Sequence, residues 1–189
     1  MGDNEILRFL GAIDAALIGH AGAGETVDIH LLGRSALILG YGLTLMTKDV
    51  DIVHVHGSRL QAIAVETFGK GTAGAGRHGF YLESVSSGLP PLPVGYQARC
   101  VDVPGPWVVI RPKRPEANDL AVTKLRRFHA KDREDLRILC DTGLLDPATL
   151  QERLDSAHLF TEEGNEGRIA SAENLRTVIA YLEGRRRTL

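Results

Sequence analysis

Two aspartates that stand two positions apart are the residues whose types and spacing best suit chemistry. Asp49 and Asp51 alternate with Val50 and Ile52, a pattern typical of a β-strand with one polar and one apolar face. Side chains two positions apart on a strand point the same way and start about 7 Å apart. Such paired carboxylates offer hard oxygen ligands to a divalent cation such as Mg²⁺. The spacing therefore predicts a metal-binding face, although a pair this short also occurs on solvated strands.

A turn and a short helix precede the two aspartates along the chain. Gly33 ends an apolar strand expected over residues 27–32, and Ser35 stands just before a short apolar helix expected over residues 36–40. Backbone N–H groups at the start of a helix favour a phosphate group, although a Gly-x-Ser turn by itself is more often ordinary turn chemistry. Thr47 lies in the loop that leads into the aspartate strand. Together these features are harder to explain by chance than any one of them.

These residues resemble the nucleotidyltransferase superfamily that includes DNA polymerase β. In that superfamily a Gly-containing turn opens a helix and is followed by a strand with Asp-hydrophobic-Asp, and Gly33, Ser35, Asp49 and Asp51 stand at matching positions. Thr47 completes a Thr-x-Asp-hydrophobic-Asp motif similar to that of the small bacterial abortive-infection (AbiEii-like) group. The resemblance implies an α+β protein with a minimal nucleotidyltransferase fold.

Two stretches further along the chain resemble motifs of the abortive-infection group. Asp119 and Lys124 match an Asp-x4-Lys motif, and Lys131, Asp132 and Asp135 match the Arg/Lys-Asp-x-x-Asp motif that follows it. A purely structural interpretation is also open, in which charged residues form i,i+4 pairs on a helix surface. The residues of that interpretation are Arg126, Arg127, Lys131 and Asp135.

The resemblance implies a role for each matching residue. It implies that Asp49 and Asp51 are catalytic and hold Mg²⁺ or Mn²⁺, together with a third carboxylate on a later strand. Asp102 is the first candidate for that carboxylate and Glu83 is the reserve, although Asp102 equally suits a turn before Pro104. The residues implied in binding a nucleoside triphosphate (NTP) are Gly33, Ser35, Thr47, Lys124 and Asp132.

By the same resemblance, the expected reaction is metal-dependent transfer of a nucleoside monophosphate from an NTP to an acceptor. RNA, a protein side chain and a small molecule stay open as acceptors, and the toxin-type enzymes of the group point to tRNA and to a cognate antitoxin protein. Arg34 stands where a second Gly or a Ser is usual, and Leu45 where an Arg is often found. These departures favour an alternative, a catalytically inactive relative that binds a nucleotide or a protein. A structural domain with solvated aspartates is the remaining alternative.

The composition is that of an ordinary globular protein. The chain has 189 residues, a formal net charge of −2, 43% hydrophobic residues and 24% charged residues. This balance gives no global basic field that would demand nucleic acid. Cys100 and Cys140 do not have the spacing of a disulfide framework or a metal site. No stretch is typical of a signal peptide or a membrane span, so we expect a cytoplasmic protein without a membrane partner.

Hydrophobic periodicity predicts a mixed β-sheet flanked by helices over residues 1–112 and a helical bundle over residues 113–189. Helices are expected at 4–20, at 58–68, from Pro115 onward, at 147–159 and at 170–182, and further strands at 80–86, 96–103 and 107–110. The Gly-rich run at 69–79 is expected to be a mobile loop. Its cations, Lys70, Arg77 and His78, are of the kind that is usually solvated, although they could also reach an anionic substrate.

Overall fold

The computed structural model describes residues 3–43, 45–86, 90–157, 164–185 and 187–189. Contacts between Cα atoms divide these residues into two compact units. The first, which we call the core unit, contains the described residues up to 86 and residues 100–115. The second, the helical unit, contains the described residues of 87–99 and of 116–189. The segment before Cys100 thus groups with the helical unit, although it lies within residues 1–112.

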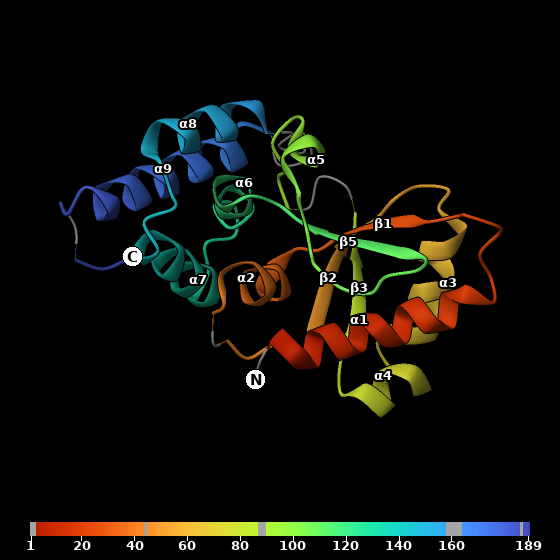
Figure 1. Ribbon diagram of the computed structural model, residues 1–189. Helices are drawn as coiled ribbons and strands as arrows, with labels where there is room; N and C mark the ends of the chain where they lie inside the picture. Colours follow the sequence, from red (N-terminus) through yellow and green to blue (C-terminus); the bar gives the residue numbers. More distant parts are fainter. Residues whose placement is uncertain (1–2, 44, 87–89, 158–163, 186) are drawn as a thin grey trace. The chain divides into compact units, whose positions relative to one another are not determined.

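Helices and strands alternate in the core unit, whereas the helical unit contains helices in its described part (Figure 1). The elements of the core unit are α1 (Asp3–Ile18), β1 (Val27–His30), α2 (Gly33–Tyr41), β2 (Asp49–Val53), α3 (Arg59–Phe68), α4 (Ala73–His78), β3 (Tyr81–Val85), β4 (Val101–Asp102) and β5 (Ile110–Arg114). Those of the helical unit are α5 (Tyr96–Arg99), α6 (Ala117–Val122), α7 (Ala130–Asp141), α8 (Pro147–Ser156) and α9 (Gly164–Leu182).

The strands of the core unit form two small sheets that are joined side by side. β1 pairs in parallel with β5, and β4 pairs antiparallel with β5, so the strand order is β1-β5-β4. β2 and β3 form a parallel pair. An antiparallel bridge between Leu31 and Ile52 links the two sheets and brings β1 beside β2 (Figure 1). This mixed pairing with flanking helices confirms the predicted α+β class and is consistent with a minimal nucleotidyltransferase fold.

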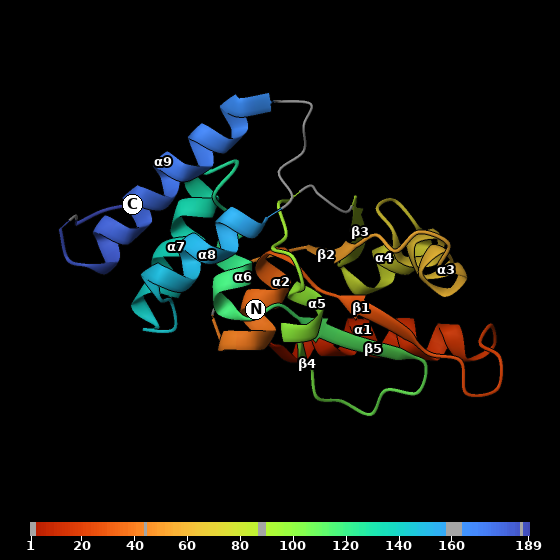
Figure 2. The same ribbon diagram turned by 90° about the horizontal axis from the view of Figure 1, so that it is seen from above.

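Helix α1 supplies much of the core, as its periodicity predicts. Its apolar face is at most 1% exposed and consists of Ile6, Phe9, Leu10, Ile13 and Leu17. Asp14 interrupts this face for a structural reason, because its buried carboxylate accepts hydrogen bonds from the backbone N–H groups of Val108, Val109 and Ile110 at 2.8–2.9 Å. A buried carboxylate needs such partners. Asp14 therefore fixes α1 to the beginning of β5, and Figure 2 shows the two elements running close together.

The Gly-rich segment is not wholly a loop, and this prediction is wrong in part. Residues 73–78 form α4, which begins where the Thr72 hydroxyl accepts a hydrogen bond of 3.1 Å from the Ala75 N–H. Gly74 allows α4 to pack closely, because a Cβ at this position would collide with the Thr67 carbonyl oxygen. Glycine here serves packing between neighbouring helices, and composition alone does not separate that use from mobility.

The strands predicted at 96–103 and 107–110 are wrong in position. Residues 96–99 form α5, and β4 is limited to Val101 and Asp102. The Arg99 side chain binds Asp119, a contact over 20 residues that local alternation cannot reveal. β5 begins at Ile110 and contains Pro112, which cannot donate a ladder hydrogen bond and therefore resembles the end of a strand.

The boundaries of the helical unit follow its caps. Pro115 is not the first helical residue, because α6 begins at Ala117 and the Glu116 carboxylate accepts hydrogen bonds from the N–H groups of Asn118 and Asp119. Asp146 caps α8 as predicted, with a bond of 2.7 Å from the Thr149 N–H. Among the described residues, no helix is long and apolar enough to cross a membrane.

Candidate metal-binding and nucleotide site

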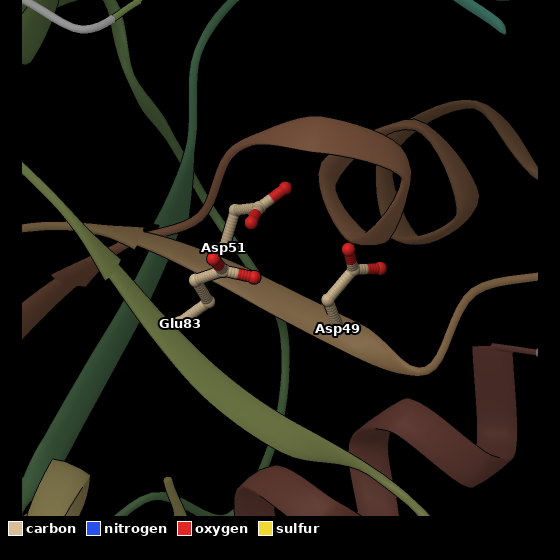
Figure 3. A group of neighbouring side chains, drawn as sticks. All are labelled: Asp49, Asp51 and Glu83. Atoms are coloured by element: carbon tan, nitrogen blue, oxygen red, sulfur yellow. The ribbon is translucent and has the colours of Figure 1, made fainter. Parts of the chain in front are cut away.

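The two aspartates project from one face of β2, as their alternation predicts. Val50 and Ile52 are fully buried, whereas Asp49 and Asp51 are half-buried on the opposite face. Glu83 of β3 stands beside Asp51 in the parallel register. Each of these three acids offers a carboxylate oxygen, and the three oxygens lie within 4.8 Å of one another (Figure 3). We call Asp49, Asp51 and Glu83 the acidic group.

Glu83, and not Asp102, stands beside the two aspartates. Asp102 is exposed on β4, where it pairs in register with Lys113 of β5. β4 lies at the edge of one sheet, while β3 is the direct neighbour of β2 in the other. Glu83, the second candidate, thus occupies the position predicted for Asp102, because the order of the strands determines which carboxylates lie close together.

The turn at Gly33 fits closely against the acidic group. The Leu32 N–H donates a hydrogen bond of 2.8 Å to the Asp51 carbonyl oxygen, which ties the turn to β2. Gly33 has a φ of +58°, and a Cβ there would collide with the Asp51 carboxylate. Both the backbone conformation and the close approach require glycine. The glycine chosen from the sequence is therefore next to the predicted metal ligands.

The side chains of Ser35 and Arg34 both donate hydrogen bonds to nearby carbonyl oxygens. Ser35 is fully buried, and its hydroxyl donates a hydrogen bond of 2.8 Å to the Leu32 carbonyl oxygen. The Arg34 guanidinium donates a bond of 3.5 Å to the Met46 carbonyl oxygen in the loop before β2. These contacts stabilise the turn and the loop, so the Ser35 hydroxyl serves local structure in this arrangement.

Thr47 acts on Asp49. Its buried hydroxyl forms a short hydrogen bond with the Asp49 carboxylate and also lies 3.1 Å from the Asp49 carbonyl oxygen. A hydroxyl that holds a ligand carboxylate fixes the orientation of that ligand. The contact gives the Thr-x-Asp spacing a physical reason, which is the positioning of Asp49.

Tyr81 borders the acidic group and was not chosen from the sequence. It stands beside Asp49 in the register of β2 and β3, two residues before Glu83 on the same face. Burial raises the pKa of Tyr81, and the negative charges of Asp49, Glu83 and Asp51 raise it further. The alternation of Tyr81 with Leu82 and Glu83 was the signal that could have found it.

Lys124 lies in a buried ion-paired cluster of the helical unit. Its Nζ atom lies 2.7 Å from Asp135 Oδ2 and 3.8 Å from Asp132 Oδ1, and the three side chains are at most 8% exposed. Arg127 donates two hydrogen bonds, of 2.9 and 3.0 Å, to the Asp132 carboxylate. The interpretation that put Asp135 on a helix surface is therefore wrong. The NTP-binding roles implied for Lys124 and Asp132 stay predictions.

Asp132 is held in its charged form by these neighbours. Burial by itself would raise the pKa of Asp132, but the hydrogen bonds from Arg127 and the charges of Lys124 and Arg127 outweigh burial and lower that pKa. The His129 N–H adds a hydrogen bond of 3.2 Å in the first turn of α7. Asp132 therefore stabilises the start of this helix.

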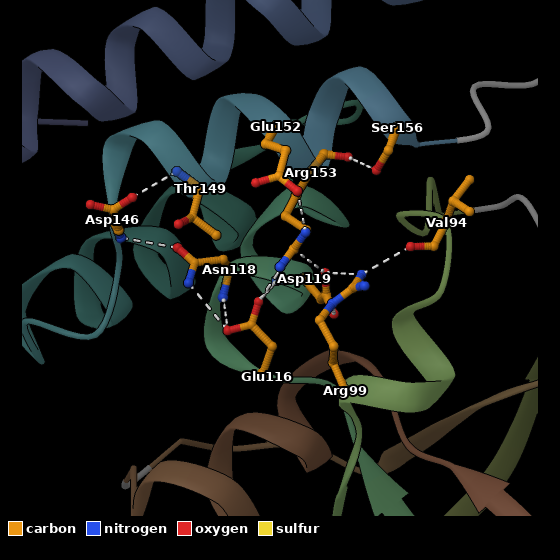
Figure 4. Close-up of polar contacts among 10 residues, drawn as sticks. All are labelled: Val94, Arg99, Glu116, Asn118, Asp119, Asp146, Thr149, Glu152, Arg153 and Ser156. Atoms are coloured by element: carbon orange, nitrogen blue, oxygen red, sulfur yellow. Dashed lines mark hydrogen bonds and ion pairs between the residues drawn. The ribbon is translucent and has the colours of Figure 1, made fainter.

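A second cluster of the helical unit surrounds Asp119 (Figure 4). The Arg99 guanidinium donates two hydrogen bonds of 2.9 Å to the fully buried Asp119 carboxylate, and Arg153 Nε lies 3.4 Å from it. Burial raises the pKa of Asp119, and the contacts with Arg99 offset only part of this effect. The motif that contains Asp119 thus has a structural use, which is to fix α5 and α8 to α6.

The donor set of the acidic group fits a hard divalent cation. Three carboxylates at mutual distances within 4.8 Å offer the oxygen ligands that suit Mg²⁺ or Mn²⁺. A structural zinc site would instead use thiolate or imidazole groups. The described residues therefore support divalent-metal binding at β2 and β3.

Comparison with known proteins agrees with this geometry. Over residues 10–188 the chain matches a family described as "Nucleotidyltransferase of unknown function (DUF6036)". No curated protein and no solved structure matches the chain. The match supports the superfamily, while membership of the abortive-infection group stays a prediction. Because the match takes in nearly the whole chain, with the acidic group and the Gly33 turn, the protein belongs to the DUF6036 family of nucleotidyltransferases.

Proposed function

We propose that this protein transfers a nucleoside monophosphate from an NTP to a hydroxyl acceptor in the presence of Mg²⁺ or Mn²⁺. The observation that carries the proposal is the acidic group, whose carboxylate oxygens lie within 4.8 Å of one another beside the Gly33 turn. Bound divalent ions neutralise triphosphate charge and lower the pKa of an attacking hydroxyl. Asp49, Asp51 and Glu83 are the residues that would hold them.

Other residues of the core unit would bind the phosphate groups of the NTP and orient the ligands of the metal. The first turn of α2 offers the backbone N–H groups of Gly33 and Ser35 to phosphate oxygens, because the beginning of a helix favours an anion. Thr47 keeps the Asp49 carboxylate in place through its hydrogen bond.

The reaction itself balances without a further co-reactant. The acceptor oxygen forms a bond to the α-phosphorus, the bond from that phosphorus to the bridging oxygen breaks, and pyrophosphate leaves with the electron pair. The acceptor proton passes to a carboxylate, for which the exposed Glu83 is the most accessible member of the acidic group.

We propose tRNA as the first acceptor to test and a cognate antitoxin as the regulatory partner, both acting in the cytoplasm. The support for these assignments is the likeness of Thr47-Lys48-Asp49-Val50-Asp51 to the motif of the abortive-infection group. The acceptor is an RNA in this proposal, and a protein side chain is the alternative outcome of the test below.

The test is incubation with each α-labelled NTP, Mg²⁺ or Mn²⁺, and total tRNA, with label transfer and pyrophosphate release measured together. Label on tRNA that is lost in Asp51→Asn supports the enzyme and its acceptor. Label on the protein itself, also lost in Asp51→Asn, keeps the reaction and replaces the acceptor. Unchanged turnover in Asp51→Asn contradicts the mechanism.

A nucleotide-binding relative without turnover is the second candidate. It is favoured by Arg34 in the turn and by the Ser35 hydroxyl, which already donates to the Leu32 carbonyl oxygen. Metal-dependent NTP binding by calorimetry, without pyrophosphate release from any NTP, would support this candidate over the enzyme.

A further inference from the structure

Lys70 stands on a turn whose conformation is fixed from both sides. Gly69 forms a bridge with Leu82 of β3, and its N–H donates a hydrogen bond of 2.7 Å to the Val65 carbonyl oxygen at the end of α3. A Cβ at Gly69 would collide with that same carbonyl oxygen, so the close approach requires glycine. On the other side, Thr72 caps α4. The backbone on both sides of Lys70 is therefore tied to regular structure.

The side chain of Lys70 reaches the residue that borders the acidic group. Its Nζ atom lies 5.7 Å from the centroid of the Tyr81 ring, within the range of a cation–π contact. Tyr81 stands beside Asp49 and on the same face as Glu83. The exposed ammonium group of Lys70 is thus at the margin of the acidic group, on an unbranched stem that can move.

The other cations of the Gly-rich segment are arranged differently. The His78 ring packs against Phe9 and Phe68, with ring centroids 5.9 and 6.1 Å apart, as part of an aromatic cluster with α1 and α3. Arg77 is exposed in the last turn of α4. The contact with Tyr81 therefore distinguishes Lys70 from its neighbours.

A cation at this place has a clear chemical use. Three carboxylates and a triphosphate bring together more negative charge than divalent ions alone neutralise, and an ammonium group forms strong charge-assisted hydrogen bonds with phosphate oxygens. We propose that Lys70 binds the pyrophosphate portion of the NTP, the portion that leaves in the reaction, and that the Tyr81 ring positions the Lys70 ammonium group. This inference rests on the proposed function, since it concerns the same site.

The test measures equilibrium binding, so it does not depend on knowing the acceptor. A non-hydrolysable α,β-methylene NTP and the matching nucleoside monophosphate are titrated into each variant with Mg²⁺ by calorimetry. Mn²⁺ binding without nucleotide is measured separately. Lys70→Gln is expected to lower the affinity for the triphosphate analogue by about 10- to 100-fold. The affinity for the monophosphate should stay unchanged, and the affinity for Mn²⁺ should be equal or higher. Lys70→Arg should restore most of the binding.

Arg77→Gln and a Tyr81 series provide the controls. Arg77→Gln removes one positive charge from the same segment and should leave analogue binding unchanged. Tyr81→Phe keeps the ring and should bind the analogue as tightly as the wild type does, whereas Tyr81→Leu should lower the affinity for the analogue. The effects of Tyr81→Leu and Lys70→Gln should not add, because both remove the same contact.

The outcomes separate this inference from the proposed function. Wild-type protein that binds Mn²⁺ but no triphosphate analogue overturns the proposed function and, with it, this inference. Wild-type protein that binds the analogue, with Lys70→Gln binding equally well, overturns the inference alone. An equal loss for the monophosphate, or an equal loss in Arg77→Gln, also overturns it, because the effect would then not belong to the pyrophosphate portion or to Lys70.

Discussion

The two units of this protein use carboxylates in opposite ways. In the helical unit, Asp119 and Asp135 are almost completely buried, and each has a cation 2.7–2.9 Å away on Arg99 or Lys124. In the core unit, three carboxylates are half-buried or exposed and lie within 4.8 Å of one another. The first arrangement joins carboxylates to cations of the chain itself, whereas the second brings like charges together at the surface.

This difference distinguishes acids that are paired with cations of the chain from acids that are grouped with one another, a distinction that the sequence motifs do not make. A buried carboxylate needs a nearby cation or N–H donors, and breaking a buried ion pair by removing one partner destabilises the fold. Like charges that are held close together lower the stability of the fold, and such an arrangement is typical of a site that binds a cation. Asp119, Asp132 and Asp135 resemble motifs of the abortive-infection group as Asp49 and Asp51 do, yet they lie in ion-paired clusters. The comparison predicts that neutralising an acid has effects of opposite sign on stability in the ion-paired clusters and in the acidic group.

The largest effect is expected from Asp135→Ala. The variant leaves the Lys124 ammonium group buried beside Asp132 without its closest partner, so the free energy of unfolding should fall by about 3–5 kcal/mol. Urea denaturation followed by far-UV circular dichroism measures this loss. The double variant Lys124→Met/Asp135→Leu removes both charges and should recover most of the stability. A loss below about 1 kcal/mol in Asp135→Ala would place the pair with ordinary surface ion pairs.

Gly33→Ala should affect both stability and metal binding. A non-glycine residue at a φ of +58° costs about 1–2 kcal/mol, and the added methyl group would push the Asp51 carboxylate aside. We expect Mn²⁺ affinity to fall about tenfold or more, as for other changes that misplace a ligand. Gly24→Ala is the matched control, because Gly24 has a φ of +74° and no heavy atom within 4 Å of the added Cβ. Equal Mn²⁺ affinity in the two variants would contradict the close fit.

Thr47→Val tests how far Asp49 depends on its supporting hydroxyl. Valine keeps the shape of threonine but cannot form the hydrogen bond with the Asp49 carboxylate. Mn²⁺ affinity should fall about tenfold, as measured by calorimetry. Thr47→Ser retains the hydroxyl and should stay close to the wild type; a loss in Thr47→Ser as large as that in Thr47→Val would assign the effect to packing.

The smallest effect, and the one of opposite sign, is expected from Glu83→Gln. Without divalent metal and at low salt, removal of one like charge from the acidic group should raise the free energy of unfolding by a few tenths of a kcal/mol. Saturating Mg²⁺ should reverse the order, because the wild type gains more stability from binding. Thermal unfolding with EDTA and with Mg²⁺ gives both numbers. A lower stability of Glu83→Gln than of the wild type in EDTA would contradict the difference between the two units.

The sequence predicted the parts of the site that follow from local periodicity. Alternation placed Asp49 and Asp51 on one face of a strand, and the strand at 80–86 contained Glu83. The apolar repeat of α1 and the caps at Ser58 and Asp146 were also visible in the sequence. Each of these features depends on residues fewer than about five positions apart, the range over which backbone geometry alone fixes neighbours.

Contacts between distant segments could not be predicted in the same way. Which carboxylate joins Asp49 and Asp51 depends on the order of strands, and both Glu83 and Asp102 lie on strands. Residues 96–99 form α5 in place of an expected strand, and Arg99 at its end pairs with Asp119, 20 residues away. Pro112 hid β5, because a proline argues against a central strand, and the parallel partner β1 lies far away in the sequence.

A segment of the helical unit interrupts the core unit in the sequence, and this affects how the chain folds during synthesis. β5 is the central strand of its sheet, yet the ribosome reaches it only after β1, β2 and β3 and after the segment that joins the helical unit. β1 therefore waits for its parallel neighbour while about 80 residues are added, a long-range pairing that slows folding. Chains released before residue 115 would expose the unpaired side of β1. The proposed nucleotidyl transfer should accordingly appear late in synthesis, and truncation within β5 should abolish it even though every residue of the acidic group is already present.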